Sequence, residues 1–361
     1  MTSSTADLVV LGGGIAGLTI ALAASERGLT AIVLDLPRSG AASRAAAGML
    51  APSVEDLPPE MLGAAIAARD FYPAYVGALR DRTGIDVPLD RTGILQLPAP
   101  GADQAAELRS RAPAPAEWLD EAALAAHEPA FAGHAGALLH PFDGAVDNVA
   151  LMDALERAAG RDPSITRVTV EVLSIDVEQR SALTRTRGRF FGSRIVLATG
   201  AWAASLPGLP RAIPVRPVRG QLLRLRSTPV HHVTYGAGGY LVPRGDTVLI
   251  GATSEEAGFE NETSLAGLSA LRSIATRAVP GLSASPVVDH WAGLRPMSLD
   301  THPILGADPE EPALVYACGY SRNGILFAPW AASQLAGLVA GAEPLALAPF
   351  SVDRPALTLR R

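Results

Sequence analysis

The sequence predicts an α/β protein in which a βαβ unit at the start of the chain is joined to a separate antiparallel sheet. Residues 8–11 form a short apolar run, typical of a buried parallel strand, and glycines at GxGxxG spacing follow it directly. Alternating apolar and polar residues at 221–225 and a hairpin pattern at 240–250 indicate half-exposed strands. A strand, a glycine turn and a helix recur at residues 314–340.

The βαβ unit has the features of a dinucleotide site. Gly12, Gly14 and Gly17 allow a sharp turn, a close approach of pyrophosphate to the backbone, and tight packing of the helix on the sheet. Free N–H groups at the N-terminus of that helix attract phosphate. Asp35 ends the second strand and is placed to accept hydrogen bonds from a ribose. The alternative is a glycine-rich turn in an ordinary βαβ unit.

Composition excludes several classes of protein. A chain of 361 residues with 48% hydrophobic and 18% charged residues can bury a sizeable core, in two domains or one large one. The net charge of −6 and the lack of a basic block argue against nucleic acid or an anionic membrane as partner. Cys318 is the only cysteine, so we expect no disulfide, no cysteine metal cluster and a cytoplasmic location. The sequence shows neither a transmembrane segment nor the basic start of a signal peptide.

Periodicity and capping residues predict the other elements. Further strands are expected at residues 30–34, 93–97, 136–140, 167–177, 189–197 and 314–319. Helices are expected at residues 62–83 (ended by Gly84), 149–159 (capped by Asp147 or Asn148), 265–279 (capped by Ser264) and 326–340. The alanine- and proline-rich residues 99–115 are predicted to form a surface connection.

A run of small residues, 39–52, stands where a nicotinamide dehydrogenase would begin its second βαβ unit. Small side chains let backbone N–H groups approach a flat, wide ligand closely. This argues against a nicotinamide dehydrogenase and favours a flavin. A flexible alanine-rich loop or helix start is the alternative.

The ordered motifs resemble those of the D-amino-acid-oxidase type of flavoproteins and, within that group, most closely the glycine oxidases of the thiamine pathway. The similar segments are GGGIAG with Asp35, SRAAAGMLAP, LATGAW, PVRGQ, YLVPR with GAT, AGLRP and GYSRNGILFAP, spread over residues 7–354. The resemblance implies an FAD-binding Rossmann-like domain of the glutathione-reductase type at residues 1–80, 145–215 and 290–361. An antiparallel-sheet substrate-binding domain is interleaved with it at residues 81–144 and 216–289. Ser254 stands where a methionine is usual, and Tyr320 and Ser321 stand where histidine and an aromatic residue are usual.

The resemblance also implies a set of FAD-binding residues. They are Gly12, Gly13, Gly14, Ile15, Ala16, Gly17, Asp35, Leu36, Ser43, Arg44, Ala47, Gly48, Met49, Val172, Thr199, Gly200, Trp202, Gly319, Arg322, Asn323, Gly324, Ile325 and Leu326.

Three residues are candidates for the chemistry. Arg295 would bind a substrate carboxylate, since a guanidinium does so with two hydrogen bonds, or it forms a structural salt bridge. Tyr240 would add its hydroxyl to the same carboxylate, or it belongs to the core. Arg322 contacts the substrate or caps the last turn.

Other polar residues are given structural roles. We name no general base, because hydride transfer to a flavin needs only a neutral amine. His290 and His302 flank AGLRP and are interpreted as structural. Glu55 and Asp56 are predicted to form a solvated loop, and Cys318 to be a core residue rather than a flavin linkage. No metal site is predicted.

The predicted function is FAD-dependent oxidative deamination of glycine or another small amine, implied by the resemblance. It would give an imine, then an oxo acid (glyoxylate) and ammonia, with hydrogen peroxide from oxygen, in thiamine thiazole biosynthesis. The expected partners are a small amine and oxygen, with homo-oligomers left open. The alternatives are an amino-acid dehydrogenase or a D-amino-acid or sarcosine oxidase on the same scaffold, a nicotinamide dehydrogenase, and a flavin-binding protein without catalysis.

Overall fold

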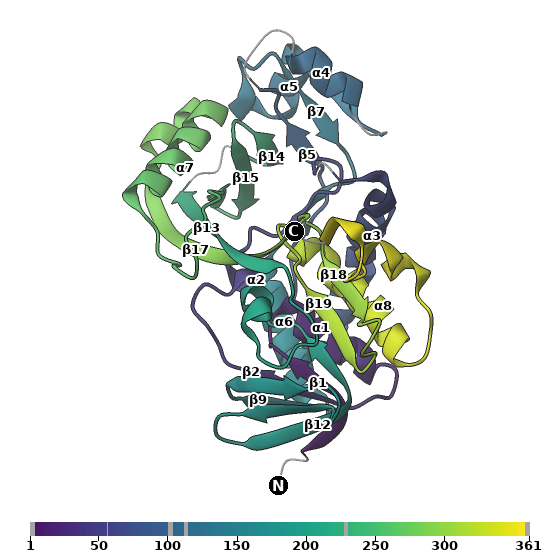
Figure 1. Ribbon diagram of the computed structural model, residues 1–361. Coiled ribbons are helices and arrows are strands. Elements are labelled where there is room, and N and C mark those ends of the chain that lie inside the picture. Colours follow the sequence, from purple (N-terminus) through teal and green to yellow (C-terminus); the bar gives the residue numbers. More distant parts are fainter. Residues whose placement is uncertain (1–3, 56, 100–103, 112–114, 227–229, 358–361) are drawn as a thin grey trace.

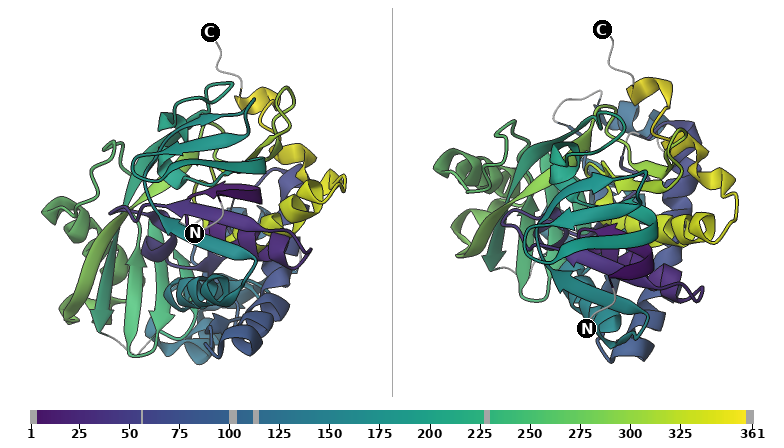
Figure 2. Two further views of the ribbon diagram at one scale, coloured as in Figure 1. Left: turned by 90° about the horizontal axis from the view of Figure 1, so that it is seen from below. Right: turned by 60° about the horizontal axis from the view of Figure 1, so that its bottom comes forward.

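The computed structural model describes residues 4–55, 57–99, 104–111, 115–226 and 230–357, and its strands form two large sheets and one small one (Figure 1). The first large sheet lies around the N-terminal βαβ unit. The second lies at the other end of the molecule, and the two views of Figure 2 keep its green strands to one side of the purple and teal strands of the first.

The first sheet is parallel at its centre. Its main path runs β10-β11-β12-β1-β2-β9, and β19 joins β12 and carries β18. Strands β2, β12, β9 and β19 extend the sheet from β1 through parallel pairings, whereas β10, β11 and β18 pair antiparallel. The strands are β1 (Thr5–Leu11), β2 (Ala31–Asp35), β9 (Ile165–Thr169), β10 (Val172–Asp176), β11 (Ser181–Thr184), β12 (Gly188–Leu197), β18 (Ile304–Ala307) and β19 (Leu314–Cys318).

The second sheet runs β17-β13-β16-β15-β14-β5-β7-β6, and every pairing is antiparallel except that of β14 with β5. The small sheet pairs β3 and β4 with β8. The strands of these two sheets are β3 (Met49–Leu50), β4 (Leu89–Asp90), β5 (Ile94–Gln96), β6 (Glu117–Asp120), β7 (Gly136–His140), β8 (Gly144–Val146), β13 (Val215–Arg226), β14 (Val233–Gly236), β15 (Gly239–Arg244), β16 (Thr247–Gly251) and β17 (Val287–Ser298).

Several helices begin or end at residues with good capping properties. Asp147 caps α6 and Ser264 caps α7 with their side chains, as predicted, and Gly84 ends α3 in the left-handed conformation. The helices are α1 (Ile15–Ser25), α2 (Ala42–Ala45), α3 (Pro59–Thr83), α4 (Gln104–Arg111), α5 (Glu121–His127), α6 (Asn148–Arg161), α7 (Leu265–Ala278) and α8 (Gly324–Val339). None of the helices in the described ranges is both long enough and apolar enough to cross a membrane.

Two element predictions need correction. The strand expected at residues 167–177 is two strands, because β9 pairs with β2 at one end of the sheet path and β10 pairs with β11 at the other. The connection expected at residues 99–115 contains α4, and the rest of it lies largely outside the described residues. The predicted domain boundaries stay a prediction, and the one at residue 290 falls inside β17, which pairs along its length with β13.

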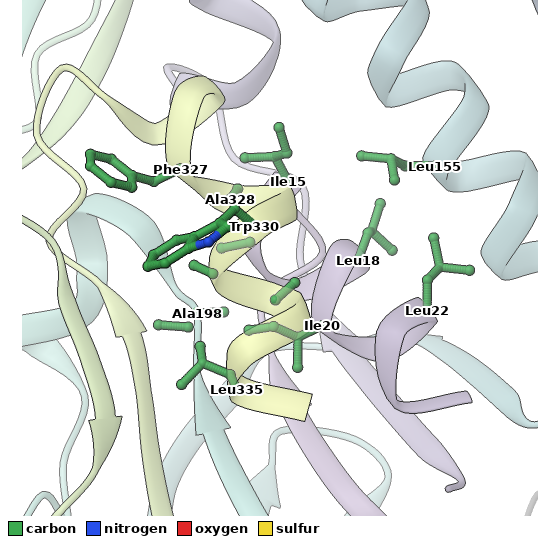
Figure 3. Close-up of a cluster of buried hydrophobic side chains, with 14 of the residues drawn as sticks. Ile15, Leu18, Ile20, Leu22, Leu155, Ala198, Phe327, Ala328, Trp330 and Leu335 are labelled. Carbon is green, nitrogen blue, oxygen red and sulfur yellow. The ribbon is translucent and has the colours of Figure 1, made fainter. Parts of the chain in front are cut away.

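Helix α1 is the centre of the largest core. It is apolar on all sides, and Figure 3 shows its Ile15, Leu18 and Leu22 between α8, which carries Trp330, and α6, which carries Leu155. These side chains are almost completely buried. Burial of each such aliphatic or aromatic side chain stabilises the fold by about 1.5–3 kcal/mol, so this core fixes the start of α1 in space.

Two glycines make this packing possible. Gly12 has a φ of 104°, and a Cβ there would lie 2.4 Å from the carbonyl oxygen of Ala198. A Cβ on Gly17 would lie 1.9 Å from the carbonyl oxygen of Gly12. Any larger residue would push α1 off the turn, as the sequence predicts for this motif.

Candidate active site

A cavity of about 1200 Å³ opens where the carboxyl ends of the parallel strands meet the second sheet. Residues at or just after the carboxyl ends of β1, β2, β9, β12 and β19 line one side of it, as expected for ligand sites in α/β sheets. The opposite side is formed by β13, the β14–β15 hairpin, the segment after β16, and β17. One cavity therefore receives residues from both large sheets.

The turn after β1 and the end of β2 are joined through Asp35. The backbone N–H of Gly13 donates to Asp35 Oδ1 at 2.8 Å, and a Cβ on Gly13 would lie 2.8 Å from the Asp35 carboxylate. Asp35 therefore packs against bare backbone and keeps its second oxygen for a ligand. This role of Gly13 was missed, because it depends on contact between two strands that the motif spacing does not specify.

The helix N-termini at this side of the cavity fit the phosphates of a dinucleotide. Gly14, the N-cap of α1, supplies no side chain to cap that end, and Ile15 N–H donates to Ser43 Oγ at 3.0 Å. The end of α8 that begins at Gly324 also lines the cavity, and within the described residues the Asn323 side chain makes no capping hydrogen bond there. Both ends direct the positive pole of a helix dipole toward the cavity.

A buried hydroxyl also lacks a partner at this wall. In the described part of the chain, Thr199 Oγ1 is buried and makes no hydrogen bond, and Thr199 lines the cavity. An unpaired buried hydroxyl costs about 1–3 kcal/mol, which a ligand with a polar group could recover. Together with bare backbone at Gly12–Gly14 and the acid at Asp35, it fits an FAD molecule.

The structure brings most of the predicted cofactor residues together. Those that line the cavity are Gly12, Gly13, Gly14, Ile15, Ala16, Asp35, Leu36, Ser43, Arg44, Ala47, Gly48, Met49, Val172, Thr199, Gly200, Trp202, Arg322, Asn323, Gly324 and Ile325. Gly17, Gly319 and Leu326 lie behind the wall: Gly17 packs on Gly12, Gly319 adopts a φ of 63° against Ile304, and Leu326 is buried in the core.

The substrate candidates Arg295 and Tyr240 meet in the same cavity. Arg295 Nη1 donates to the carbonyl oxygen of Thr253 at 2.9 Å, and the guanidinium lies over Gly220, where a Cβ would be 2.4 Å away. Tyr240 forms a hydrogen bond with Arg295, and burial raises the pKa of its hydroxyl although the positive charge of Arg295 opposes this. A Cβ on Gly251 would lie 2.2 Å from the Tyr240 ring, so both side chains rest on glycine backbone.

Glu55 is not part of a solvated loop, which corrects the prediction. Its side chain is only 11% exposed, lines the cavity, and pairs with Arg322 at 2.6 Å between Oε2 and Nη2. Burial raises the pKa of Glu55 above its ordinary value, and the charges of Arg322 and Arg295 oppose the rise. The error arose because two adjacent acids beside prolines indicate a surface loop, whereas the ion-pair partner of Glu55 lies near the other end of the chain. Asp56 lies outside the described residues.

Sequence reasoning also missed Tyr235 as part of the wall. It lies directly opposite Tyr240 in the β14–β15 hairpin and lines the cavity. Burial raises the pKa of its hydroxyl, and Glu55 adds to the rise. Ser254, which was predicted to bear on substrate choice, also lines the cavity.

The residues interpreted as structural lie away from this site. His290 Nδ1 lies 2.9 Å from Thr263 Oγ1 on the surface, and His302 packs near Asp300 and Arg354. Cys318 is fully buried in β19, and burial raises the pKa of its thiol to about 12. His290, His302 and Cys318 do not line the cavity. Among the described residues, no group of three or more histidine, cysteine, aspartate or glutamate side chains could hold a metal ion.

Comparison with known proteins identifies the family. A family model described as DAO, FAD dependent oxidoreductase, matches residues 7–338. The chain belongs to this family. FAD is the family's cofactor, and the cavity residues described above fit it.

Individual relatives agree with this. The bifunctional protein ThiO/ThiG of Synechocystis sp. is 36% identical over 352 residues, which are 93% of this chain and 52% of that protein. The chain thus spans about half the length of such bifunctional relatives. The glycine oxidase of Geobacillus kaustophilus is 34% identical over 96% of this chain and 97% of its own. A crystal structure of glycine oxidase from that organism has a TM-score of 0.91, with 32% identity over 98% of this chain and 99% of that one. The predicted α/β fold class is confirmed.

Proposed function

We propose that the chain catalyses FAD-dependent oxidative deamination of glycine or another small amine, with oxygen as the electron acceptor. Relatives of full length that carry the name glycine oxidase support this proposal. For glycine, the overall reaction converts glycine, oxygen and water into glyoxylate, ammonia and hydrogen peroxide. A place in the formation of the thiamine thiazole and a cytoplasmic location are part of the proposal, and the oligomeric state is left open.

The observation that carries the proposal is the convergence of Arg295 and Tyr240 in the cavity that also fits FAD. A guanidinium has five N–H donors. Arg295 uses Nη1 on the carbonyl oxygens of Thr253 and Arg219 and forms one further hydrogen bond with Tyr240. Donors therefore remain for a two-pronged contact with a carboxylate. Arg322 is a weaker candidate for this contact, because Glu55 already pairs with it and its side chain is 53% exposed.

The residues around this cation have distinct roles in the proposed reaction. FAD, when bound, supplies the acceptor for the hydride that leaves the substrate Cα. Arg295 would fix the substrate carboxylate, and the Tyr240 hydroxyl would donate a second hydrogen bond to it. Tyr235 would cover the substrate from the side of the hairpin and exclude water, which strengthens the ion pair of the carboxylate with Arg295.

The choice of amine depends on the segment after β16. Ser254 lines the cavity at a position where a methionine is usual in glycine oxidases. The side chain at this part of the wall is therefore smaller and more polar. We therefore include small amino acids other than glycine among the proposed substrates. Glu55 should disfavour those with an acidic side chain, because a second carboxylate would face an anion in a partly dehydrated site.

Anaerobic mixing with a panel of amino acids tests the proposal. Glycine and similar amino acids should bleach the visible absorbance of the flavin, and admission of air should restore it with formation of hydrogen peroxide. Bleaching without reoxidation by air would identify a dehydrogenase instead. A flavin that none of these amines bleaches would refute the proposed activity.

A further inference from the structure

We propose that Phe259 is a positioning residue for the cofactor: it acts through Trp202 and holds the wall of the cavity closed at its cofactor end. Phe259 lies in the segment 256–263. This segment is part of the connection between strand β16 of the second sheet and helix α7. Trp202 follows β12 of the first sheet and lines the cavity. This inference concerns retention of FAD and holds whichever amine is oxidised.

The two rings form a stacked pair between the sheets. Their centroids are 5.8 Å apart and their planes differ by 19°. Phe259 is 47% exposed, so much of its apolar surface remains in contact with solvent. Burial in a hydrophobic core therefore does not explain its contact with Trp202. Trp202 also lies near Arg38, whose Cζ is 5.4 Å from the centroid of the Trp202 ring. Arg38 lines the cavity and lies close to Glu171, with 3.6 Å between Nη2 and Oε1.

A second contact holds the same segment against the first sheet. Asn261 Nδ2 donates to Ser39 Oγ at 2.7 Å, and a Cβ on Gly40 would lie 2.8 Å from Asn261. Ser39 and Gly40 directly follow the residues after Asp35 that line the cavity. The segment 256–263 therefore touches the chain on both sides of the cofactor end, at Trp202 and at Ser39–Gly40.

Both ends of the segment are anchored in the second sheet by one buried side chain. Gln221 of β13 is fully buried. Its Nε2 donates to Glu255 Oε1 at 2.7 Å, and its Oε1 accepts from Ser264 N–H at 2.8 Å. The residues just before and just after the segment are thus both held by Gln221, which anchors the segment that carries Phe259 to β13.

The stack should act on FAD affinity by preorganisation. Without Phe259, the Trp202 side chain gains rotamers that it must lose again when the cofactor binds. Immobilising such a side chain weakens binding by about two- to tenfold. The effect should appear mainly in the dissociation rate, because most changes of affinity within one binding site are changes of that rate.

The test compares Phe259→Ala and Phe259→Tyr with Phe142→Ala. Phe142 is a matched control, because it is 48% exposed and also lies near an arginine (Arg69, 5.7 Å) but does not line the cofactor cavity. The rise of FAD fluorescence on release gives the dissociation rate, and titration of the apoprotein gives the dissociation constant. Phe259→Ala should raise both about two- to tenfold, whereas Phe259→Tyr and Phe142→Ala should stay within about twofold of the wild type.

A double-mutant cycle with Trp202→Ala tests whether Phe259 acts through Trp202. In the Trp202→Ala background, Phe259→Ala should have no further effect on FAD release. Urea unfolding of the apoproteins should give similar midpoints for Phe259→Ala and Phe142→Ala. Wild-type FAD release from Phe259→Ala, equal weakening by Phe142→Ala, or additive effects in the cycle would each overturn the proposal.

Discussion

Replacement of Arg295 gives the most direct test of the substrate site. In Arg295→Ala, a substrate carboxylate would enter a cavity whose remaining nearby charges are the Glu55–Arg322 pair. Truncation of one partner of a buried charge pair costs about 2–5 kcal/mol, which is about thirty- to several thousandfold in kcat/KM. The upper part of this range is expected, because loss of the Arg295 charge also leaves the partly buried Glu55 less compensated.

Two companion variants set the scale. Arg295→Lys keeps the charge and can still donate to the Thr253 carbonyl oxygen, but an ammonium cannot make the two-pronged contact, so it should recover only part of the loss. Arg322→Ala removes an arginine that is half exposed and already paired with Glu55, so kcat/KM for glycine should fall less than in Arg295→Ala, even though Glu55 loses its ion pair.

Steady-state kinetics and flavin content decide the outcome. Arg295→Ala and Arg295→Lys should keep their FAD, because Arg295 lies on β17 of the second sheet. The loss in Arg295→Ala should appear mainly in KM for glycine, and small amines without a carboxylate should be almost unaffected. If Arg295→Ala keeps the wild-type KM while Arg322→Ala loses it, the carboxylate is bound by Arg322 and the reasoning is wrong.

Three further predictions concern acidic residues. Asp35→Ala should weaken FAD binding about ten- to a hundredfold in titrations of the apoprotein, with normal turnover at saturating FAD. Burial would raise the pKa of Glu128, but hydrogen bonds from His232 and His231 lower it to about 2. The lowered pKa of Glu128 therefore adds about 3 kcal/mol to the free energy of unfolding above pH 4.5, and this contribution is lost as the pH falls toward 2. Acid unfolding of Glu128→Gln should depend less on pH across that range than unfolding of the wild type. The pKa of Glu55 is raised instead, so ionisation of Glu55 lowers the free energy of unfolding of the wild type as the pH rises from 4.5. In urea unfolding, Glu55→Gln should therefore become more stable relative to the wild type over this range. An unchanged difference would contradict this.

Local sequence predicts how the residues of the βαβ unit meet. The packing at Gly17 and the contact of Asp35 with Gly13 depend on residues close together in the chain, whereas the turn at Gly12 also closes against Ala198, directly after β12. The caps at Asp147 and Ser264 are predictable for the same reason. Short-range spacing and capping chemistry carry this information.

Contacts between distant segments were not predictable in the same way. Glu55 is followed by a second acid in a proline-rich stretch, and its ion pair with Arg322 places it in the cavity. Phe259 stands among polar residues, and its sequence gives no sign of the stack with Trp202. In both cases the partner comes from another part of the chain, so the local pattern indicates a surface loop.

The segment after β16 links the two halves of the site physically. Thr253 at its start accepts a hydrogen bond from Arg295, and Phe259 further along stacks on Trp202. Gln221 lies between these contacts: its N–H donates to Thr253 Oγ1 at 2.9 Å, and its side chain holds Glu255. A shift of this segment would therefore move the orientation of the substrate cation and the wall beside the cofactor together. The proposed roles of Arg295 at the substrate and of Phe259 at the cofactor therefore both depend on Gln221, which holds Thr253 and Glu255.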